Sequence, residues 1–239
     1  MSITNLVQST GVVAVTICAL LTASVTSVSA APWATAGPCP DIEVVFARGT
    51  GQPPGVGDVG QMFVDSLRSK VGEKSMNVYG VNYPASTDFS TAMVGIDDAG
   101  SHIEHMAAGC PNTRMVLGGF SQGAAVIGFV TSDTIPDGAP SDAPKPMPLD
   151  VANHVAAVVL FGMPSESLMH SIGAPPIAIG PLYAPRTTQL CAAGDPICSD
   201  GGNWAAHTSY IDDGMVEQAA DFAARRLQAT GSEGRPPAR

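Results

Sequence analysis

The run of residues 114–131 constrains the fold more than any other part of the chain. It reads RMVLGGFSQGAAVIGFVT, an apolar strand-like segment that passes through Gly-Phe-Ser-Gln-Gly directly into an apolar helical segment. A strand followed at once by a helix is typical of α/β proteins, in which helices connect parallel strands. The run therefore predicts a strand-turn-helix unit with Ser121 at its turn.

The remainder of the chain alternates between the same two patterns. Strands are predicted at 41–47, 76–83, 114–120, 155–161 and 187–191. Helical spacing of apolar residues is found through Met62, Phe63, Leu67 and Val71, and over 96–108, 122–131 and 215–227. This alternation predicts an α/β fold whose central five-stranded parallel sheet is covered by helices on both faces and connected by right-handed crossovers.

The composition limits what such a fold can bind. The 239 residues carry a formal net charge of −10, and 45% of them are hydrophobic while 13% are charged. This excludes a disordered acidic chain, which would have few apolar residues and many charges. Because Lys and Arg form no cluster, we expect no nucleic-acid binding. We expect one folded domain over residues 37–228 and a flexible tail over residues 229–239.

Residues 11–28 form an uncharged run of apolar and small residues, which indicates a secretory signal. Small residues stand before two candidate cleavage sites, after Ala30 and after Ala36, so residues 1–30 are predicted to be a signal peptide. An uncleaved membrane anchor is the alternative, since about 20 apolar residues can span a bilayer. We expect a secreted protein that is extracellular or associated with the cell wall.

Five cysteines are present, one of them within the predicted signal. The other four suit two disulfides in an oxidising compartment, and the sequence alone permits three pairings. Cys191 and Cys198 enclose a short loop and are natural partners, which leaves Cys39 with Cys110. The alternative is a zinc site of Cys191, Cys198 and His207, but it contains no Cys-x-x-Cys pair and does not suit that compartment.

Residues 119–123 have the form Gly-x-Ser-x-Gly at a strand-to-helix junction. In this context the sharp turn lifts the serine hydroxyl above the sheet, and the glycines let neighbouring chains approach closely. Ser121 is therefore a candidate nucleophile. Gln122 begins the helix, with its N–H directed toward the oxyanion that an attacked carbonyl would form. A tight turn with a solvated serine is the alternative interpretation.

A serine nucleophile requires a base and an acid, which follow it in the order Ser, Asp, His in this architecture. His207 is the candidate base because it follows the last predicted strand and precedes the last predicted helix. His154 begins a predicted strand and is expected at the surface. His170 is expected in a loop without a suitably placed acid before it.

Asp195 is the candidate acid because it follows the last strand, between Cys191 and Cys198. Asp200 is its main competitor. The acidic residues that precede the fourth strand are expected to be solvated loop residues: Asp133, Asp137, Asp142 and Asp150. The sequence thus indicates a triad of Ser121, Asp195 and His207.

Residues 39–228 resemble the cutinases and cutinase-like serine esterases, which are small secreted α/β-hydrolases, and they are more similar to the bacterial branch than to the fungal one. The similarity rests on CPDIEVVFARGTG at the first strand, GFSQG at the turn, CAAGDPIC around the candidate acid, and the later His207. The spacing Cys-x3-Asp-x2-Cys is far more specific than Gly-x-Ser-x-Gly by itself.

The resemblance implies a small α/β-hydrolase without a large lid, in which Ser121 forms an acyl-enzyme and no metal or organic cofactor takes part. It implies an oxyanion hole formed by the backbone N–H groups of Thr50 and Gln122. Thr50 stands where fungal relatives usually carry Ser, and it keeps the hydroxyl. The disulfide pairs that the resemblance implies are Cys39–Cys110 and Cys191–Cys198.

The expected substrates are apolar acyl esters or lipids, hydrolysed by a monomer that makes transient contact with lipid surfaces. Residues 172–185 read IGAPPIAIGPLYAP and are either the lining of an acyl groove or a stiff connector before the last strand. Two alternatives remain open. One is a phospholipase or lipase that acts on membrane or cell-wall lipids, and the other is a non-catalytic secreted surface protein that kept the fold.

Overall fold

The strands and helices alternate along the chain in the computed structural model, which describes residues 38–232. The strands are β1 (Ile42–Ala47), β2 (Met76–Gly80), β3 (Arg114–Phe120), β4 (Val155–Phe161) and β5 (Thr187–Leu190). The helices are α1 (Gly57–Val71), α2 (Ala92–Gly109), α3 (Gln122–Val130), α4 (Glu166–Ser171) and α5 (Met215–Ser232). Neighbouring strands all pair in parallel in the order β2-β1-β3-β4-β5, which confirms the predicted α/β fold.

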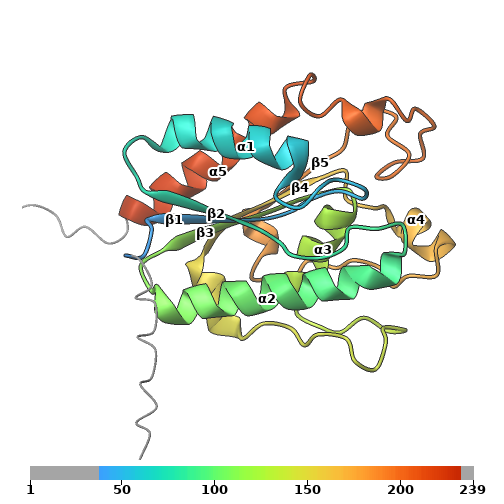
Figure 1. Ribbon diagram of the computed structural model, residues 1–239, viewed down its shortest axis with the longest axis horizontal. Coiled ribbons are helices and arrows are strands. Elements are labelled where there is room, and N and C mark those ends of the chain that lie inside the picture. The colour runs from blue at the N-terminus through green and yellow to red at the C-terminus, as the bar shows by residue number, and fades with distance from the viewer. Residues whose placement is uncertain (1–37, 233–239) are drawn as a thin grey trace, which may run out of the picture. The chain divides into compact units, whose positions relative to one another are not determined.

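Helices cover both faces of this sheet (Figure 1). One face carries α1 and α5, and the other carries α2 and α3. The third strand in spatial order, β3, leads into Ser121, while the edge strand β5 leads into the segment that contains Asp195 and His207. Because the carboxyl ends of parallel strands meet at one edge of the sheet, these three residues belong to loops at the same edge.

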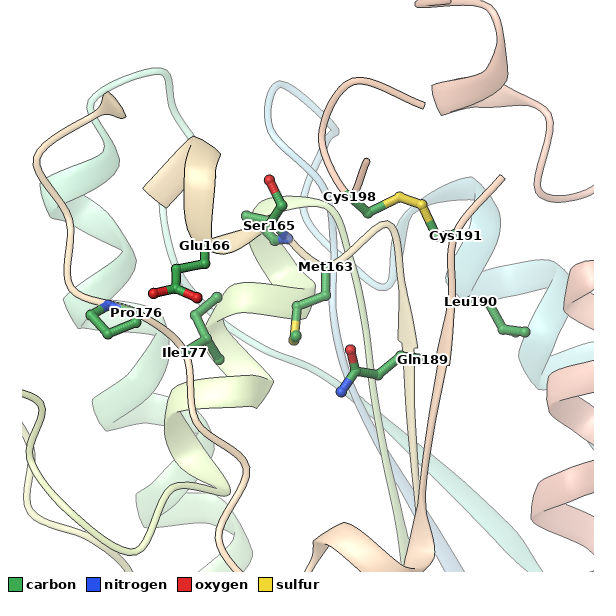
Figure 2. A pocket seen from close by; sticks show the side chains of 10 residues that line it. Met163, Ser165, Glu166, Pro176, Ile177, Gln189, Leu190, Cys191 and Cys198 are labelled. Atoms are coloured by element: carbon green, nitrogen blue, oxygen red, sulfur yellow. A yellow bond between two sulfur atoms is a disulfide. The ribbon is translucent and has the colours of Figure 1, made fainter. Parts of the chain in front are cut away.

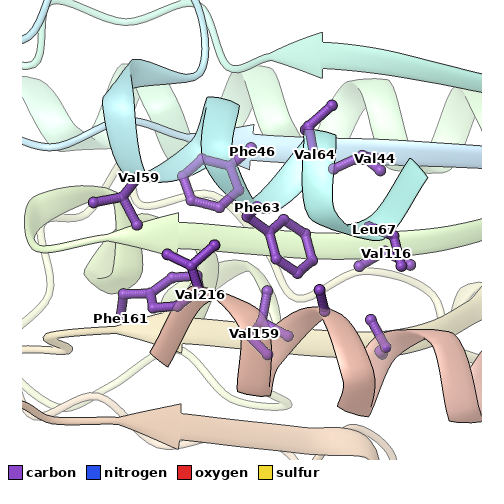
Figure 3. Close-up of a cluster of buried hydrophobic side chains, with 14 of the residues drawn as sticks. Val44, Phe46, Val59, Phe63, Val64, Leu67, Val116, Val159, Phe161 and Val216 are labelled. Carbon is purple, nitrogen blue, oxygen red and sulfur yellow. The ribbon is translucent and has the colours of Figure 1, made fainter. Parts of the chain in front are cut away.

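A cluster of aromatic residues lies in the core between the sheet and the helices α1 and α5 (Figure 3). Phe46 of β1, Phe63 of α1 and Phe161 of β4 are fully buried, and their ring centroids lie 6.1 to 6.4 Å apart. Such pairs contribute about 0.5–1.5 kcal/mol each beyond the burial of their area. Small residues of α5, among them Ala219 and Ala220, allow that helix to lie close to the sheet.

The opposite face is packed against α2 and α3 by the alternate residues of the same strands, because successive side chains of a strand point to opposite faces. In β1, for example, Val44 faces the first layer and Val45 the second. The second layer contains one buried charged residue of β1, Glu43, whose Oε1 accepts a hydrogen bond of 2.9 Å from Nε2 of His102 on α2.

β1 and β5 are each one residue shorter than the sequence predicts, and β2 is shorter by three. β2 ends at Gly80, whereas the apolar pattern predicts a strand up to Tyr83. The carbonyl groups of Val81 and Tyr83 accept hydrogen bonds from the buried guanidinium of Arg48. These groups are therefore bound by a side chain instead of continuing the pairing of the sheet.

The segment around His170 was expected to be a loop, and the structure shows that this is wrong, because the residue lies on the short helix α4. The helix begins after Ser165, whose hydroxyl accepts a hydrogen bond from the N–H of Leu168. A serine at this position satisfies one of the N–H groups that a helix leaves free at its start, which stabilises the helix by about 1 kcal/mol.

Two disulfides have the pairing expected from the sequence. Cys39–Cys110 joins the segment before β1 to the residue after α2, and Cys191–Cys198 closes a loop directly after β5. Because the sulfurs of Cys191 and Cys198 are bonded to each other, they are not available as the thiolates that a zinc ion binds.

Residues 1–37 and 233–239 lie outside the part of the chain that the structure describes. The predicted signal peptide, residues 1–30, therefore lies outside it, as do both candidate cleavage sites. α5 continues to Ser232, so the first residues of the predicted tail, 229–232, are helical rather than flexible coil. Within residues 38–232, no helix has the length and apolar character needed to cross a membrane.

Candidate active site

Ser121 stands at the turn between β3 and α3 with a φ of 55°, a conformation that residues other than glycine rarely adopt. Two glycines allow the chains around it to approach closely. A Cβ on Gly119 would lie 2.2 Å from the carbonyl oxygen of Gly123, and a Cβ on Gly123 would lie 2.0 Å from that of Ala47. The N–H of Ser121 donates to the carbonyl of Phe161 at 2.9 Å. This strained turn presents the hydroxyl at the end of the sheet.

Ser121, His207 and Asp195 form a continuous chain of hydrogen bonds. The Oγ of Ser121 lies 2.9 Å from Nε2 of His207, and Nδ1 of His207 lies 2.8 Å from Oδ2 of Asp195. An ionised carboxylate can only accept hydrogen bonds, so Nδ1 carries the imidazole proton and Nε2 accepts from the serine hydroxyl. The arrangement has the geometry in which a histidine withdraws a proton from a serine.

Asp195 is completely buried, in the loop that the second disulfide closes. Its Oδ1 accepts from the N–H of Ile197 at 2.8 Å, and its Oδ2 accepts from the hydroxyl of Tyr210 at 2.5 Å as well as from His207. Burial is the main cause that raises the pKa of the Tyr210 hydroxyl, and the hydrogen bond to Asp195 raises it further. The sequence analysis missed Tyr210, for which the only local signal is its position three residues after His207.

Three aromatic rings contact the imidazole of His207. Phe120 stacks on it with ring centroids 4.9 Å apart, and Trp204 and Tyr210 each meet it edge-on at 6.4 Å. Phe120 directly precedes Ser121, so the ring that orients the base also belongs to the turn of the nucleophile. Trp204 is 66% exposed and places an apolar surface at the entrance of the site.

The structure brings together the two expected oxyanion donors, Thr50 and Gln122. Within the described chain, no hydrogen bond uses the backbone N–H of either residue. Gln122 is the first residue of α3, and the first N–H groups of a helix have no acceptor inside it. The Thr50 hydroxyl donates to Oε1 of Gln122 at 3.4 Å, and Nε2 of Gln122 donates to the carbonyl of Ser86 at 3.2 Å. The Gln122 side chain thereby connects the loops that follow β1, β2 and β3.

Arg48, which the sequence analysis also missed, organises the loop that carries Thr50. Its guanidinium donates to the carbonyl groups of Gln52 at 2.9 Å, Val81 at 3.2 Å and Tyr83 at 2.5 Å. The hydroxyl of Tyr83 in turn donates to the carbonyl of Arg48. A single arginine that follows the apolar run IEVVFA is the sequence signal that could have identified it.

The other candidates from the sequence lie apart from this chain of hydrogen bonds. His154 ends the 3₁₀ turn η2 (Leu149–His154) directly before β4, at the opposite end of that strand from Phe161. His170 is exposed on α4, and Asp200 is exposed after the disulfide loop. The acidic residues before β4 are all exposed: Asp133, Asp137, Asp142 and Asp150.

A cavity of about 290 Å³ lies beside the loop that carries Asp195 (Figure 2). Its lining consists of Met163, Pro164, Ser165, Glu166, Pro176, Ile177, Gln189, Leu190, Cys191 and Cys198. Two of these residues belong to the segment 172–185, so part of that segment lines a hollow in addition to connecting α4 with β5. Ser121 is not among the lining residues of this cavity.

Comparisons with known proteins agree on one family. The probable carboxylesterase Culp5 of Mycobacterium tuberculosis is 74% identical over 165 residues, which cover 69% of this chain and 95% of that protein. The phospholipase Culp4 of the same organism is 51% identical over 197 residues, which cover 82% of this chain and 83% of that protein. A cutinase of Trichoderma reesei, solved with a phosphonate inhibitor, has a TM-score of 0.60 and 33% identity, and the match covers 80% of this chain and 78% of that one.

The family model described as cutinase matches residues 38–227. These residues include every strand of the sheet, both disulfides, and the hydrogen-bonded Ser121, His207 and Asp195. The chain therefore belongs to the cutinase family.

Proposed function

We propose that the protein hydrolyses carboxylic esters through an acyl-enzyme on Ser121. The observation that carries the proposal is the chain of hydrogen bonds from Oγ of Ser121 through His207 to the buried Asp195. His207 takes the serine proton as Oγ attacks the ester carbonyl, and it then gives this proton to the leaving alcohol. Asp195 stays ionised and stabilises the imidazolium between these steps. A water activated by His207 releases the acid and restores the serine.

The backbone N–H groups of Thr50 and Gln122 form the proposed oxyanion hole. Each tetrahedral intermediate places a negative charge on the former carbonyl oxygen, and one preorganised donor at such a site is worth about 3 kcal/mol. The bonds of the Gln122 side chain to Thr50 and Ser86 support this assignment, because they hold the two donor segments together before substrate arrives. The proposed mechanism requires neither a metal nor an organic cofactor.

The proposed substrates are apolar acyl esters and lipids that the enzyme meets at a lipid surface. Two exposed aromatic residues support this proposal. Trp204 contacts His207 and is 66% exposed, while Phe89 is 47% exposed in the loop whose Ser86 carbonyl is bonded to Gln122. Exposed apolar side chains beside a reaction site favour contact with an apolar phase. The similarity to the phospholipase Culp4 supports phospholipids as a second substrate class.

The proposal also includes secretion and action as a monomer. Two disulfides suit an oxidising compartment, and the predicted signal peptide of residues 1–30 would direct the chain there. A monomer is sufficient because one chain supplies the nucleophile, the base, the acid and both oxyanion donors.

The variant Ser121→Ala tests the proposed chemistry. Loss of Oγ should abolish hydrolysis of p-nitrophenyl esters and labelling by a fluorophosphonate probe, while the melting temperature stays close to that of the wild type. Ser171→Ala, which alters an exposed serine of α4, is the control and should keep both activity and labelling. Activity of Ser121→Ala within tenfold of the wild type would contradict the assignment. A wild-type protein that the probe does not label would favour the non-catalytic surface protein.

Chain-length profiles on p-nitrophenyl esters and release of fatty acid from phospholipid vesicles would distinguish the substrate classes. If Trp204 meets the lipid, Trp204→Ala should lower the rate on vesicles at least fivefold more than the rate on a short soluble ester. Equal losses on both substrates would contradict contact with lipid through this residue.

A further inference from the structure

Tyr210 has the largest side chain among the fully buried residues of the described chain. Its ring meets those of Phe120 and Phe161 edge-on, with centroids 5.6 and 6.0 Å away. Phe120 directly precedes Ser121, and the carbonyl of Phe161 accepts the N–H of Ser121. The ring of Tyr210 is therefore held between the two strand ends that position the nucleophile.

The hydroxyl of Tyr210 has three polar neighbours, and their chemistry determines where its proton points. They are Oδ2 of Asp195 at 2.5 Å, the N–H of Ala192 at 3.3 Å and Sγ of Cys198 at 3.4 Å. The Ala192 N–H can only donate, and a disulfide sulfur carries no proton and accepts weakly. The hydroxyl therefore accepts from Ala192 and donates its single proton to Asp195.

The space around this contact is closed. A Cβ added to Gly162 would lie 2.8 Å from the Tyr210 hydroxyl, 3.2 Å from Oδ2 of Asp195 and 3.3 Å from Cε1 of His207. The Tyr210 hydroxyl, the Asp195 carboxylate and the His207 imidazole therefore pack closely together at this glycine. Without the hydroxyl, Oδ2 keeps a single donor, the Nδ1–H of His207.

We propose that Tyr210 is a positioning residue of the catalytic machinery, which acts on His207 through Asp195. The inference rests on the function proposed for the triad and deepens it. A donor on Oδ2 withdraws charge from the carboxylate, so the proton stays on the imidazole when His207 becomes charged. The same bond prevents the carboxylate from turning away from the imidazole. Within the described chain, Asp195 is the one titratable group bonded to the hydroxyl, since Cys198 is in a disulfide.

Tyr210→Phe removes the hydroxyl and keeps the ring. We expect kcat on a soluble p-nitrophenyl ester to fall about tenfold, with KM within about twofold, because a misplaced acid affects the transition state more than binding. The midpoint of the acidic limb of kcat/KM should move up by about half a pH unit, because a carboxylate with one donor fewer stabilises the imidazolium more strongly. A role in packing alone would not move this midpoint, so an unchanged kcat and an unchanged midpoint overturn the proposal.

The same substitution in the Asp195→Asn background shows whether Tyr210 acts through the carboxylate. If it does, Tyr210→Phe changes the residual kcat of Asp195→Asn by less than about twofold. An equal loss in both backgrounds overturns the proposal. Tyr183→Phe is the matched control, because it removes the hydroxyl of another buried tyrosine outside the site, and it should keep the wild-type kcat and midpoint. An equal shift in this control likewise overturns the proposal.

A second variant keeps the hydroxyl and tests its strength as a donor. Site-specific 3-fluorotyrosine at position 210 has a more acidic hydroxyl, so the midpoint should move down, opposite to the effect of phenylalanine. This measurement applies even if Tyr210→Phe does not fold, and a midpoint that rises or stays constant overturns the proposal. Failure of the triad assignment is distinguishable, because Ser121→Ala would then retain activity.

Discussion

Gly123 lies so close to Ala47 that a Cβ built on it would stand 2.0 Å from the carbonyl oxygen of Ala47. This contact brings the first turn of α3 against the end of β1, beside the loop that carries Thr50. Only a residue without a side chain fits there, so this glycine of Gly-x-Ser-x-Gly sets the distance between the two proposed oxyanion donors.

Gly123→Ala should therefore displace the start of α3 and with it Ser121 and Gln122. We expect a lower melting temperature and a loss of kcat greater than tenfold. The loss of kcat is large because a shift of about 1 Å can cost on the order of a hundredfold in rate. Gly100→Ala on α2 is the matched control, because a Cβ there meets nothing within 4 Å. In a helix interior that change should stabilise the protein by about 0.5–1 kcal/mol. Similar results for the two variants would contradict this explanation.

The disulfide Cys39–Cys110 should matter mainly for stability. The two cysteines are 71 residues apart, and chain-entropy arguments give such a cross-link about 4 kcal/mol. The double variant Cys39→Ser, Cys110→Ser should thus have a clearly lower melting temperature, while the kcat of the folded fraction stays close to that of the wild type. A large loss of kcat at a temperature well below unfolding would be inconsistent with this expectation.

The disulfide Cys191–Cys198 should matter mainly for turnover. Its cysteines are 7 residues apart, so the entropic contribution is smaller, about 2.5 kcal/mol. The loop holds Asp195, however, and Sγ of Cys198 contacts the Tyr210 hydroxyl at 3.4 Å. We expect the double variant Cys191→Ser, Cys198→Ser to lose more in kcat than the double variant Cys39→Ser, Cys110→Ser. Wild-type kcat in this variant would mean that Tyr210 and Ile197 hold the carboxylate without the cross-link.

The rate of ester hydrolysis should depend on pH because His207 acts as the base. A neutral imidazole accepts the proton of Ser121 and an imidazolium does not, so activity should be lost as pH falls. We therefore expect kcat/KM to rise with pH and to level off once the imidazole is neutral. Profiles from pH 5 to 9, with the melting temperature recorded at each pH, separate titration from unfolding. A flat profile in folded protein would argue against a histidine base.

The contact between the buried Glu43 and the partly buried His102 should contribute to stability and not to catalysis. Oε1 of Glu43 is bonded to His102 at 2.9 Å, and Oε2 has no partner within the described residues. His102→Ala would leave the buried carboxylate without this bond and remove a ring stacked 3.6 Å from Tyr79, so we expect a loss of about 3 kcal/mol in urea unfolding. His105→Ala, at an exposed position of the same helix, should have little effect. Comparable losses in the two variants would contradict a special role for the pair.

Local patterns in the sequence predicted the five strands, four of the five helices and the triad of the candidate site, but they missed α4 and Tyr210. β3 and β4 have the predicted limits, because continuous apolar runs bounded by polar residues mark strands that are buried on both faces. Ser121, Asp195 and His207 were found from their positions after strands, and the structure places their side chains within hydrogen-bonding distance. Their roles in catalysis stay predictions until the variants are measured.

Only the tertiary structure decided the contacts that join distant segments. The end of β2 depends on Arg48, which binds carbonyl groups more than 30 residues later in the chain. Asp195 accepts a hydrogen bond from Tyr210, fifteen residues later in the chain, and Gly162 after β4 packs against this contact. Periodicity reports which face of an element is apolar, whereas such hydrogen bonds depend on the spacing and register of whole strands. The sequence by itself therefore predicted the strands, most of the helices and the candidate reacting groups, whereas the packing of the sheet decided which side chains hold these groups in place.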